Sequence, residues 1–599
     1  MTFEKLITNH IDIWSSSLQT RSTAGRGSNG KIDLYGIKKL RELILELAVR
    51  GKLVPQDPND EPASLLLKRI AAEKAELVKQ GKIKKQKPLP EISEDEKPFE
   101  LPKGWEWCRL GDLAYNSEAG WSPQCEAAPR VDDNWGVLKI SSVTWGEFAP
   151  EENKALPKHL EPKIEYEVKA RDFLISRANT ADLVARSVVV PESLPKHLML
   201  SDKIIRFQFS ILIDANYINL FNNAGYSRSY YSDVAGGTSS SMKNVSRLQV
   251  SSLLIGLPTY KEQLRIVYKA RDLMSLCDQL EQRSLTSLEA HQQLVETLLT
   301  TLADSQNAKE LAENWARISQ HFDTLFTTEA SIDALKQTIL QLAVMGKLVP
   351  QDPNDEPASE LLKRIEQEKA QLVKEGKIKK QKPLPPVSDE EKPFVLPMGW
   401  EWCRLGDLAL GSEAGWSPQC ESHPRNGDDW GVLKISAVTW GEFNAEENKA
   451  LPVKLEPKQE YEVKGNDFLL SRANTSELVA RSVVVPQTVP KHLMLSDKII
   501  RFQFPDLIDV NYINIVNNSM LSREYYGIVA GGTSASMKNV TRNQVSLLPV
   551  ALPPYNEIKK IISVIESVLV LVDTLKNLVV KSEGIKKNLT DSIIFHFEN

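Results

Sequence analysis

Hydrophobic positions follow two different spacings along this chain, and these spacings predict where helices and strands lie. Ile37, Leu40 and Ile44 have the three- and four-residue spacing of an amphipathic helix. Intervals of four and three also follow Tyr260, which is typical of a helix packed against another helix. A helix from there to about Leu302 has roughly 40 residues and a length on the order of 60 Å. The chain is therefore predicted to contain a long helical framework.

Residues 101–258 have a different pattern, in which short apolar runs alternate with clusters of Gly, Pro, Asn and Asp. The runs at 135–145, 172–180 and 202–209 are rich in β-branched and aromatic residues, as strands are. The clusters between them are typical of turns. This region is predicted to be a globular domain of mixed α/β or mostly β structure.

The whole pattern occurs twice, at an offset of 295 residues that holds from Ile37 to Tyr260. Between residues 101–209 and 396–504, 87 of 109 positions are identical. Two near-identical globular units suit a two-fold or repetitive target. Duplex DNA, whose strands are antiparallel, is the commonest target of this kind.

The repeat predicts five segments. They are an N-terminal helical region with a basic linker (1–100), a first globular domain (101–258), a central helical region with a second basic linker (259–395), a second globular domain (396–553) and a C-terminal helix (554–599). The first 35 residues match their offset counterparts poorly, and no repeat follows the last helix. The C-terminal helix is therefore expected to dock beside N-terminal elements in a pseudo-circular arrangement.

Each linker carries a lysine run, at 82–87 in the first and at 377–382 in the second. The neighbouring prolines predict a stiff segment. A solvated linker is the favoured interpretation of the lysines, and contact with DNA phosphates is the alternative.

Composition and charge set the outer limits on function. At 599 residues, with 41% hydrophobic and 26% charged residues, the chain is long enough for several globular domains. A net charge of −5 excludes a coat of basic residues, although local basic surface still allows DNA binding. The five cysteines form no C-x-x-C pair, which argues against zinc ribbons and disulfide frameworks. A cytoplasmic location is expected, because the N-terminus lacks a signal-type apolar run and no segment has the apolar length of a membrane span.

Three local motifs are interpreted as structural. The segment Gly25–Lys31 contains G-x-G-x-x-G but follows a polar stretch, so it is predicted to be a flexible loop. The L-P-P-Y at 552–555 lacks the Asn or Asp that opens the adenine methyltransferase motif, and is predicted to be a turn. His197 and His492 have no neighbouring Cys or His and are not expected to bind metal. No nucleophile stands in a recognisable pattern with a base, so the chain is predicted to be non-catalytic and to bind no cofactor or metal.

Three phrases recur in both halves in the same order. G-W-x-W-x-x-L-G-D opens each globular domain (104–112 and 399–407), and L-P-x-Y-x-E closes it (257–262 and 552–557). GKLVPQDPNDEPAS precedes a helix at 51–64 and 346–359. With this order and duplication, nearly the whole chain resembles the DNA specificity subunit of type I restriction–modification systems.

The resemblance implies an α+β protein in which two α/β target-recognition domains are separated by long conserved helices. These helices form an antiparallel coiled coil, with pseudo-two-fold symmetry. Each domain would read one half of a bipartite site on double-stranded DNA, and the chain itself would be non-catalytic. The implied partners are two methyltransferase subunits, which use S-adenosylmethionine to methylate adenine N6. Two restriction subunits, which use ATP and magnesium, can join them.

Three segments of the first domain hold candidates for DNA contact. In 118–126, Gln124 suits bidentate hydrogen bonding to adenine, while the alternative for Trp121 is a place in the core. In 176–180, Arg177 and Asn179 are the residue types that read guanine and adenine. The alternative there is a surface loop with a local Asn turn. In 236–244, hydroxyls and Lys243 after a pair of glycines are typical of a loop that holds phosphates.

Four further basic residues, Arg186, Lys196, Lys203 and Arg206, are candidates for neutralising phosphates, although a solvated charge is the favoured interpretation of each one alone. Arg206 and its copy Arg501 are candidates for phosphate contact and not for base contact. The full set of candidate DNA contacts is Trp121, Ser122, Gln124, Arg177, Asn179, Thr180, Arg186, Lys196, Lys203, Ser241, Lys243 and Asn244, with the copies Trp416, Ser417, Gln419, Arg472, Asn474, Thr475, Arg481, Lys491, Lys498, Ser536, Lys538 and Asn539.

Near-identical domains related by a two-fold axis predict near-identical half-sites on opposite strands. The expected target is thus an inverted repeat interrupted by a nonspecific gap. Differences between the domains would break this symmetry wherever they touch bases. They include Ala127/Ser422, Ala128/His423, Val131/Asn426, Asp132/Gly427, Ala170/Gly465 and Arg171/Asn466.

Two other functions compete with this interpretation. A self-contained restriction or modification enzyme would need a glycine-rich cofactor turn and an Asn/Asp-Pro-Pro-aromatic loop in a methyltransferase domain, and the sequence has neither. A non-DNA coiled-coil scaffold with duplicated protein-binding domains fits the same layout. It predicts no salt-sensitive affinity for DNA.

Overall fold

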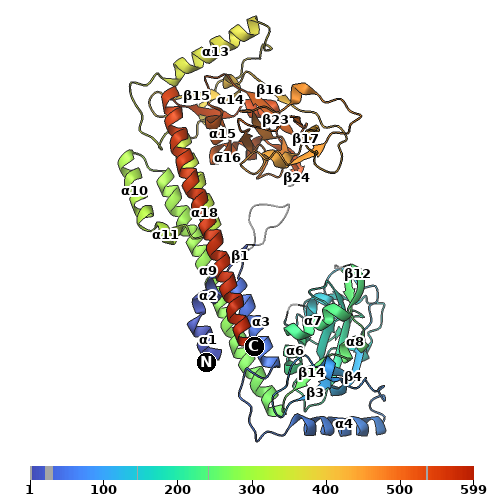
Figure 1. Ribbon diagram of the computed structural model, residues 1–599. Helices are drawn as coiled ribbons and strands as arrows, with labels where there is room; N and C mark the ends of the chain where they lie inside the picture. The colour runs from blue at the N-terminus through green and yellow to red at the C-terminus, as the bar shows by residue number, and fades with distance from the viewer. Residues whose placement is uncertain (1–2, 21–31, 145, 240–241, 535–536, 599) are drawn as a thin grey trace. The chain divides into compact units, whose positions relative to one another are not determined.

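The computed structural model describes residues 3–20, 32–144, 146–239, 242–534 and 537–598 (Figure 1). The predicted loop at Gly25–Lys31 and the candidate contacts Ser241 and Ser536 lie outside these residues. The chain divides into two compact units. Unit 1 comprises residues 1–19, 34–285 and 585–599, and unit 2 comprises residues 20–33 and 286–584.

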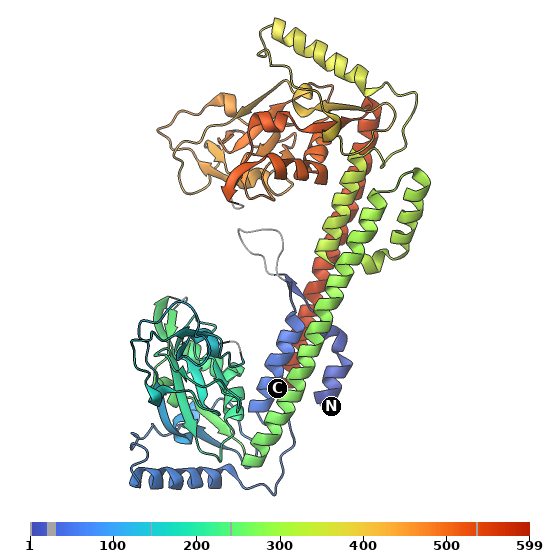
Figure 2. The same ribbon diagram turned by 180° about the vertical axis from the view of Figure 1, so that it is seen from behind.

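The helical part of unit 1 is built on α3 (Tyr35–Val49), the helix predicted from Ile37, Leu40 and Ile44. Helix α2 (Ile11–Ser16) packs against α3, and α1 (Phe3–Asn9) packs against α2 (Figures 1 and 2). Gly51 follows α3 with φ +67, and a Cβ there would approach Pro102 Cγ to 2.5 Å. Glycine suits this left-handed, crowded position, which ends the helix.

The C-terminal end of α18 (Tyr555–Glu598) also belongs to unit 1. Tyr35 Oη donates a 2.6 Å hydrogen bond to Asp591 Oδ1, and Lys587 Nζ lies 4.9 Å from the centre of the Tyr35 ring. Burial and the hydrogen bond to Asp591 raise the pKa of Tyr35. The predicted contact between the C-terminal helix and an N-terminal element is therefore present.

The globular part of unit 1 is organised around an antiparallel sheet. Its strand order is β4 (Ala114–Ala119), β11 (Ile204–Phe209), β7 (Phe173–Ser176) and β9 (Ser187–Val189). All four residues of β7 are buried, because this apolar strand lies between two neighbours in the sheet interior. Smaller sheets have the orders β10–β5–β6, β12–β13–β8 and β14–β3. Their strands are β3 (Glu106–Arg109), β5 (Gly136–Leu138), β6 (Asn153–Ala155), β8 (Ala178–Asn179), β10 (Leu198–Met199), β12 (Gly236–Ser239), β13 (Met242–Asn244) and β14 (Leu254–Leu257).

Helices connect these strands and carry the unit's linker. Strands β3 and β14 pair antiparallel, so the chain enters and leaves the globular part side by side before α9 (Tyr260–Ala303) begins. The first part of α9, residues 260–285, belongs to unit 1. The other helices are α4 (Ala63–Lys79), α5 (Leu110–Leu113), α6 (Ala215–Asn223), α7 (Gly225–Val234) and α8 (Arg247–Ser251), with 3-10 turns η1 (Glu94–Glu96), η2 (Ile140–Val143) and η3 (Ile164–Tyr166).

Unit 2 contains a globular part with the same strand order, each residue 295 positions later. Its main sheet is β16–β23–β19–β21, and its smaller sheets are β18–β17–β22, β20–β25–β24 and β15–β26. The strands are β15 (Glu401–Arg404), β16 (Gly411–Ala414), β17 (Gly431–Leu433), β18 (Asn448–Ala450), β19 (Phe468–Ser471), β20 (Ala473–Asn474), β21 (Ser482–Val484), β22 (Leu493–Met494), β23 (Ile499–Gln503), β24 (Gly531–Ser534), β25 (Met537–Asn539) and β26 (Pro549–Leu552). Its helices and 3-10 turns are α14 (Leu405–Leu408), α15 (Val510–Asn518), α16 (Met520–Val529), α17 (Arg542–Ser546), η4 (Asp389–Glu391), η5 (Ile435–Val438) and η6 (Gln459–Tyr461).

The helical part of unit 2 has one apolar cluster formed by several helices. Val295 and Leu299 of α9, Ile332 of α12 (Glu329–Val344) and Val572 of α18 are buried together in it. Ile318 of α10 (Ala308–Gln320) joins the same cluster. Helices α9 and α18 thus share a core here, as their heptad-like spacing predicts. The remaining elements are α11 (Phe322–Leu325), α13 (Ala358–Lys374), β1 (Gln19–Thr20) and β2 (Ile32–Asp33).

Candidate nucleic-acid interface

Two of the predicted segments meet in one small sheet. Strand β13 pairs with β8, placing Lys243 opposite Asn179 and Asn244 opposite Ala178. The backbone N–H of Val245 also donates to the carbonyl of Arg177 at 2.9 Å. The structure therefore brings together residues 176–180 and 236–244, which are separated by more than 50 positions in the sequence. Lys538 and Asn474 pair in the same way in unit 2.

The third segment reaches this sheet through Asp202. The Ser122 hydroxyl donates to Asp202 Oδ1 and accepts from the Asp202 N–H at 3.0 Å. Arg177 Nη1 lies 3.4 Å from the Asp202 carbonyl oxygen, and Lys203 Nζ lies 3.5 Å from Asp202 Oδ2. Ser122 and Lys203 thus contact the Asp202 carboxylate, and Arg177 contacts the backbone carbonyl of the same residue. Sequence reasoning missed Asp202, although S-D-K in both copies places it directly before a predicted lysine.

The same group is present in unit 2 around Asp497. Ser417 Oγ shares two hydrogen bonds with Asp497, and Lys498 Nζ lies 3.2 Å from its Oδ2. Arg472 Nη1 lies 3.4 Å from the Asp497 carbonyl. Burial opposes the charge of Asp497, but the Ser417 hydroxyl and Lys498 hold its pKa below the ordinary value. An ionised carboxylate here fixes the positions of the Ser417 hydroxyl and Lys498, while Arg472 is held by the backbone carbonyl.

Several candidates have partners inside the protein. Asn179 Oδ1 accepts from the Thr180 N–H at 2.9 Å, and its Nδ2 donates to Thr144 Oγ1 at 3.3 Å. This local turn is the alternative that the sequence left open, and Asn474 and Thr475 repeat it. Lys243 Nζ donates to the Gly237 carbonyl at 2.9 Å, within its own hairpin, as does Lys538 to Gly532. For these residues direct DNA contact stays a prediction.

The remaining candidates lie apart from this group. Trp121 and Trp416 are half-buried, and Lys163 Nζ lies 4.5 Å from the centre of the Trp121 ring. Gln124, Gln419, Lys196 and Lys491 are exposed. Arg186 and Arg481 are half-buried, and burial lowers the pKa of both. These positions are compatible with contact to a ligand but are not held by the Asp202 or Asp497 group.

The predicted phosphate contact of Arg206 is wrong. Arg206 is 2% exposed, and its Nε and Nη2 donate to Glu118 Oε1 while Nη1 donates to Asp172 Oδ2 at 3.0 Å. Burial disfavours the charge, but Asp172 and Glu118 hold the pKa of Arg206 above its ordinary value. The side chain is therefore a structural ion pair in the sheet. Arg501 is 3% exposed and makes the same contacts with Glu413 and Asp467, so its predicted role is wrong for the same reason.

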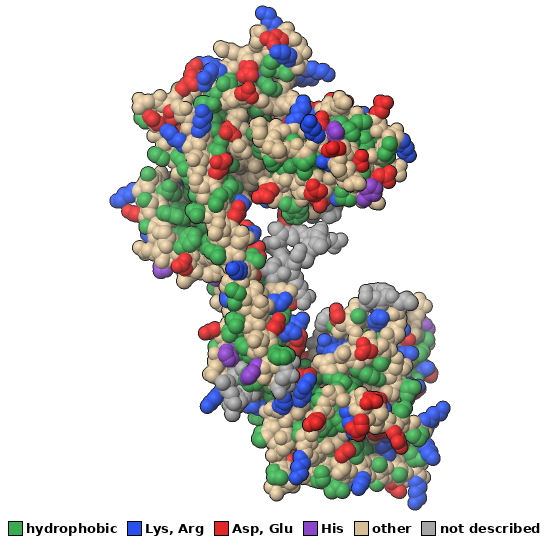
Figure 3. Space-filling view, viewed as in Figure 1, with side chains coloured by type: hydrophobic (Ala, Val, Ile, Leu, Met, Phe, Trp, Pro, Cys, Tyr) green, Lys and Arg blue, Asp and Glu red, His purple; other side chains and the backbone are tan. Residues whose placement is uncertain are grey.

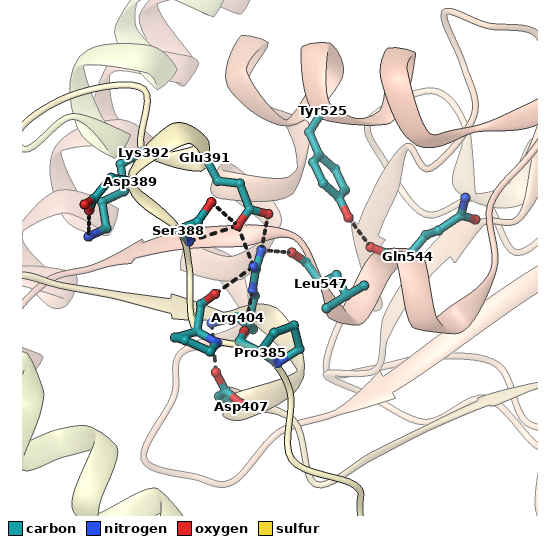
Figure 4. Close-up of polar contacts among 11 residues, drawn as sticks. Pro385, Ser388, Asp389, Glu391, Lys392, Arg404, Asp407, Tyr525, Gln544 and Leu547 are labelled. Carbon is teal, nitrogen blue, oxygen red and sulfur yellow. Dashed lines mark hydrogen bonds and ion pairs between the residues drawn. The ribbon is translucent and has the colours of Figure 1, made fainter.

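The predicted linkers are held against the globular parts by a buried arginine. In unit 2, Arg404 Nη1 and Nη2 donate to the two carboxylate oxygens of Glu391 at 2.8 and 2.7 Å (Figure 4). Arg404 also donates to the carbonyls of Pro385 and Leu547. The hydrogen bonds from Arg404 lower the pKa of Glu391 to about 2. Arg109 and Glu96 form the same clamp in unit 1.

The described part of the chain gives little support for a metal site or a membrane-spanning helix. His197 Nδ1 lies 2.7 Å from the Asp133 carbonyl, and its ring lies against Trp135. Among the described residues, no group of three or more His, Cys, Asp or Glu has the arrangement of a metal site. Nor does any helix in the described ranges have the length and apolar character to cross a membrane. On the visible face of each unit, Lys and Arg side chains are interspersed with Asp and Glu (Figure 3).

Comparison with known proteins gives two full-length matches. Over 601 residues the chain is 53% identical to the type I restriction enzyme EcoEI specificity subunit of Escherichia coli, with 99% of each chain covered. Over 608 residues it is 47% identical to the type I restriction enzyme EcoAI specificity subunit of the same organism, again with 99% of each chain covered. A chain from a solved type I R-M system has a TM-score of 0.45 and 15% identity, covering 84% of this chain and 99% of that one. No family model matches.

Proposed function

The chain belongs to the specificity subunits of type I restriction enzymes, and from this premise we propose that its two recognition units read the two halves of an interrupted, inverted-repeat DNA site. It is the DNA-recognition subunit of a type I restriction–modification system. Catalysis belongs to partner subunits, as is the case for specificity subunits in this family. Recognition of the DNA sequence therefore depends on side chains of this chain.

The observation that carries the proposal is the recurrence of the Asp202 group around Asp497. Ser122, Arg177 and Lys203 in unit 1 and Ser417, Arg472 and Lys498 in unit 2 have the same partners at similar distances. Specific base contacts depend on the type and placement of the side chain. Identical side chains held in the same way recognise the same bases, so the two half-sites are alike.

The relation between the half-sites depends on how the helices arrange the two units. We infer an antiparallel coiled coil of α9 and α18 with a pseudo-two-fold axis. Two contacts support it: residues of α9 and α18 share one apolar cluster in unit 2, and Asp591 near the end of α18 bonds to Tyr35 in unit 1. In that arrangement the two readers face opposite strands, and the site is an inverted repeat with a nonspecific gap.

The proposed partners follow from the family. Two methyltransferase subunits bind the helical regions and transfer a methyl group from S-adenosylmethionine to adenine N6. Two restriction subunits, which use ATP and magnesium, join the complex when the site is to be cleaved. The complex works on DNA in the cytoplasm. A protein-binding scaffold without DNA affinity is not favoured, because both full-length relatives are specificity subunits.

Methylome sequencing tests the proposal. A host lacking other methyltransferases expresses this chain together with its methyltransferase subunits, and methylated adenines are mapped on both strands. The expected result is one interrupted motif whose two halves are inverted copies. Two unrelated half-sites, or an uninterrupted motif, would contradict it. A salt titration of binding to the mapped duplex then separates DNA recognition from a protein-binding scaffold, since phosphate contacts make affinity fall with salt.

A further inference from the structure

The lysine run of the first linker is pinned to the globular part of unit 1. Gln86, near the end of the run, donates from Nε2 to the carbonyl of Tyr115 at 2.8 Å and to that of Ala114 at 3.4 Å. Lys74 of α4 donates to Gln86 Oε1 at 3.2 Å and also to the carbonyl of Gly111. The run therefore follows the edge of the globular part instead of being a free linker. A solvated linker, which is the interpretation that the sequence favours, does not account for these contacts.

The lysines on either side of Gln86 remain exposed. Lys84, Lys85 and Lys87 have no hydrogen-bond or ion-pair partner among the residues that the structure describes. With Arg247 of α8 they line a groove of ≈ 610 Å³ beside β4. Asp112 is the one carboxylate among the described residues that line it, and its Oδ2 already accepts from the Arg109 N–H at 3.1 Å. The groove therefore has an unneutralised positive charge.

This groove continues into the proposed base-contacting region. A second groove, of ≈ 560 Å³, also contains Arg247 and Leu248 and is lined in addition by Arg177. Its carboxylate, Glu118, is paired with Arg206. Arg247, which lines both grooves, thus lies between Arg177, in the proposed reading region, and the pinned lysines.

We propose that the pinned lysines, Lys84, Lys85 and Lys87, together with Arg247, bind the phosphates of DNA that flanks the half-site. The proposal rests on the proposed function, because it takes duplex DNA as the ligand of the neighbouring region. A lysine ammonium is a compact charge on a flexible stem, suited to phosphate and not to one base. These contacts therefore add affinity for any sequence and place the duplex against the readers.

Lys74 of α4 and Gln86 hold the lysine run in a fixed position along the surface, and this position favours binding. A free lysine tract loses backbone freedom when it binds, whereas a tract already fixed along the surface loses less. Burial lowers the pKa of Lys74, which uses its hydrogen bonds inside the protein and does not reach the ligand. Lys74 is thus a positioning residue for the exposed lysines.

The arrangement occurs again in unit 2. Gln381 donates to the carbonyls of Leu410 at 2.8 Å and Ala409 at 3.4 Å, and Lys369 occupies the place of Lys74. Its exposed cations are Lys379, Lys380 and Lys382, again without a partner among the described residues, with Arg542 in the place of Arg247. Each recognition unit therefore has its own phosphate-binding tract.

A charge-matched pair of variants tests the proposal in the complex with the methyltransferase subunits. The triple variant Lys84→Gln, Lys85→Gln, Lys87→Gln removes three charges from the groove. Its control, Lys68→Gln, Lys79→Gln, Lys103→Gln, removes three exposed lysines outside it. Binding is measured against salt for a duplex with the mapped site and for an unrelated duplex of equal length. The slope of log K against log salt is expected to become shallower by roughly 2–3 in the groove variant on both duplexes. The methylated sequence is expected to stay the same.

The outcomes separate this proposal from the proposed function. An unchanged slope in the groove variant, or an equal change in the control, would overturn the phosphate-binding role while leaving sequence recognition intact. A wild-type complex without salt-dependent DNA binding would overturn the proposed function itself. Gln86→Ala keeps every charge and frees the tract, so it should weaken binding with little change in slope. Full affinity in Gln86→Ala would overturn the role of pinning.

Discussion

The two recognition units share their buried polar contacts almost residue for residue, whereas the helices beside them are covered in different ways. In unit 1, α3 packs against α2, where Trp14 is fully buried and a Cβ at Gly36 would lie 2.3 Å from the Trp14 carbonyl oxygen. In unit 2, α12 shares its core with Ile318 of α10 and with Phe326. An ion pair needs particular partners at particular distances, but an apolar surface needs only area and fit. The buried polar contacts are therefore the same in both units, while the apolar cover of the helices differs.

Two of the differences between the recognition units leave the local backbone unchanged. Asp132 and Gly427 both have φ 51, and Arg171 and Asn466 both have φ 65. Both pairs lie on the surface. At these two positions the units thus differ in an exposed side chain while the backbone keeps the same φ.

The largest effect is expected from Arg206→Ala in unit 1 or Arg501→Ala in unit 2. Each leaves two partly or fully buried carboxylates without their partner, which costs about 3–5 kcal/mol of unfolding free energy. Hydrogen exchange of peptides that contain Ser210–Ile211 or Pro505–Asp506 distinguishes the units, because the strands themselves are identical in sequence. Each variant should lose protection in its own unit by a similar amount.

Lys158→Ala is the control for these variants, since Lys158 is exposed. It should stay within about 0.5 kcal/mol of the parent. Unequal losses from Arg206→Ala and Arg501→Ala would show that the two ion-pair networks differ in energy despite their matching contacts.

The next effect concerns base recognition by Arg177 and Arg472. If each reads the same base in its own half-site, Arg177→Ala and Arg472→Ala relax specificity at equivalent positions of opposite halves, by about 1–3 kcal/mol each. Methylation rates are measured on duplexes in which one base of one half is changed at a time. Relaxation of the same half by both variants, or at unrelated bases, would break the proposed correspondence.

Local patterns in the sequence predicted the helices well, because helical spacing is a property of neighbouring residues. The expected helix from Tyr260 to about Leu302 ends at Ala303. Contacts between distant strands were beyond such reasoning. Arg206 lies opposite Glu118 in the β4–β11 pair, a partner 88 positions away, so its burial was not visible in the sequence. For the same reason the candidates were recognised by type, while the role of Asp202 in gathering them was not.

A smaller effect is expected where the units differ by one strained position. Arg171 and Asn466 share a left-handed backbone, which Asn tolerates better than Arg. Arg171→Asn should therefore stabilise unit 1 and Asn466→Arg should destabilise unit 2, each by about 1 kcal/mol. Urea unfolding of the two reciprocal variants measures both shifts. A stabilising Asn466→Arg would show that side-chain contacts, and not backbone strain, separate the units here.

The smallest effect is expected at the arginine clamps, where the hydrogen bonds differ in length between the units. Arg404 bonds Glu391 at 2.7 and 2.8 Å, whereas Arg109 bonds Glu96 at 3.0 and 3.1 Å. Both carboxylates are over a third exposed, so solvent screening limits each clamp to about 1 kcal/mol or less.

Acid should release the two clamps at different pH. The hydrogen bonds from Arg404 lower the pKa of Glu391 to about 2, and hydrogen bonds from the Ser93 backbone and Arg109 lower the pKa of Glu96. A lowered pKa means that the stabilisation is complete above the carboxyl's ordinary pKa and is lost as pH falls through the folded value. Hydrogen exchange of residues 88–97 and 383–392 is followed from pH 5 downward, with Glu96→Gln and Glu391→Gln as pH-independent references. The linker of unit 1 should open at the higher pH, since its longer bonds hold the carboxylate less firmly. Simultaneous opening of both linkers would mean that these distances do not set the strength of the clamp.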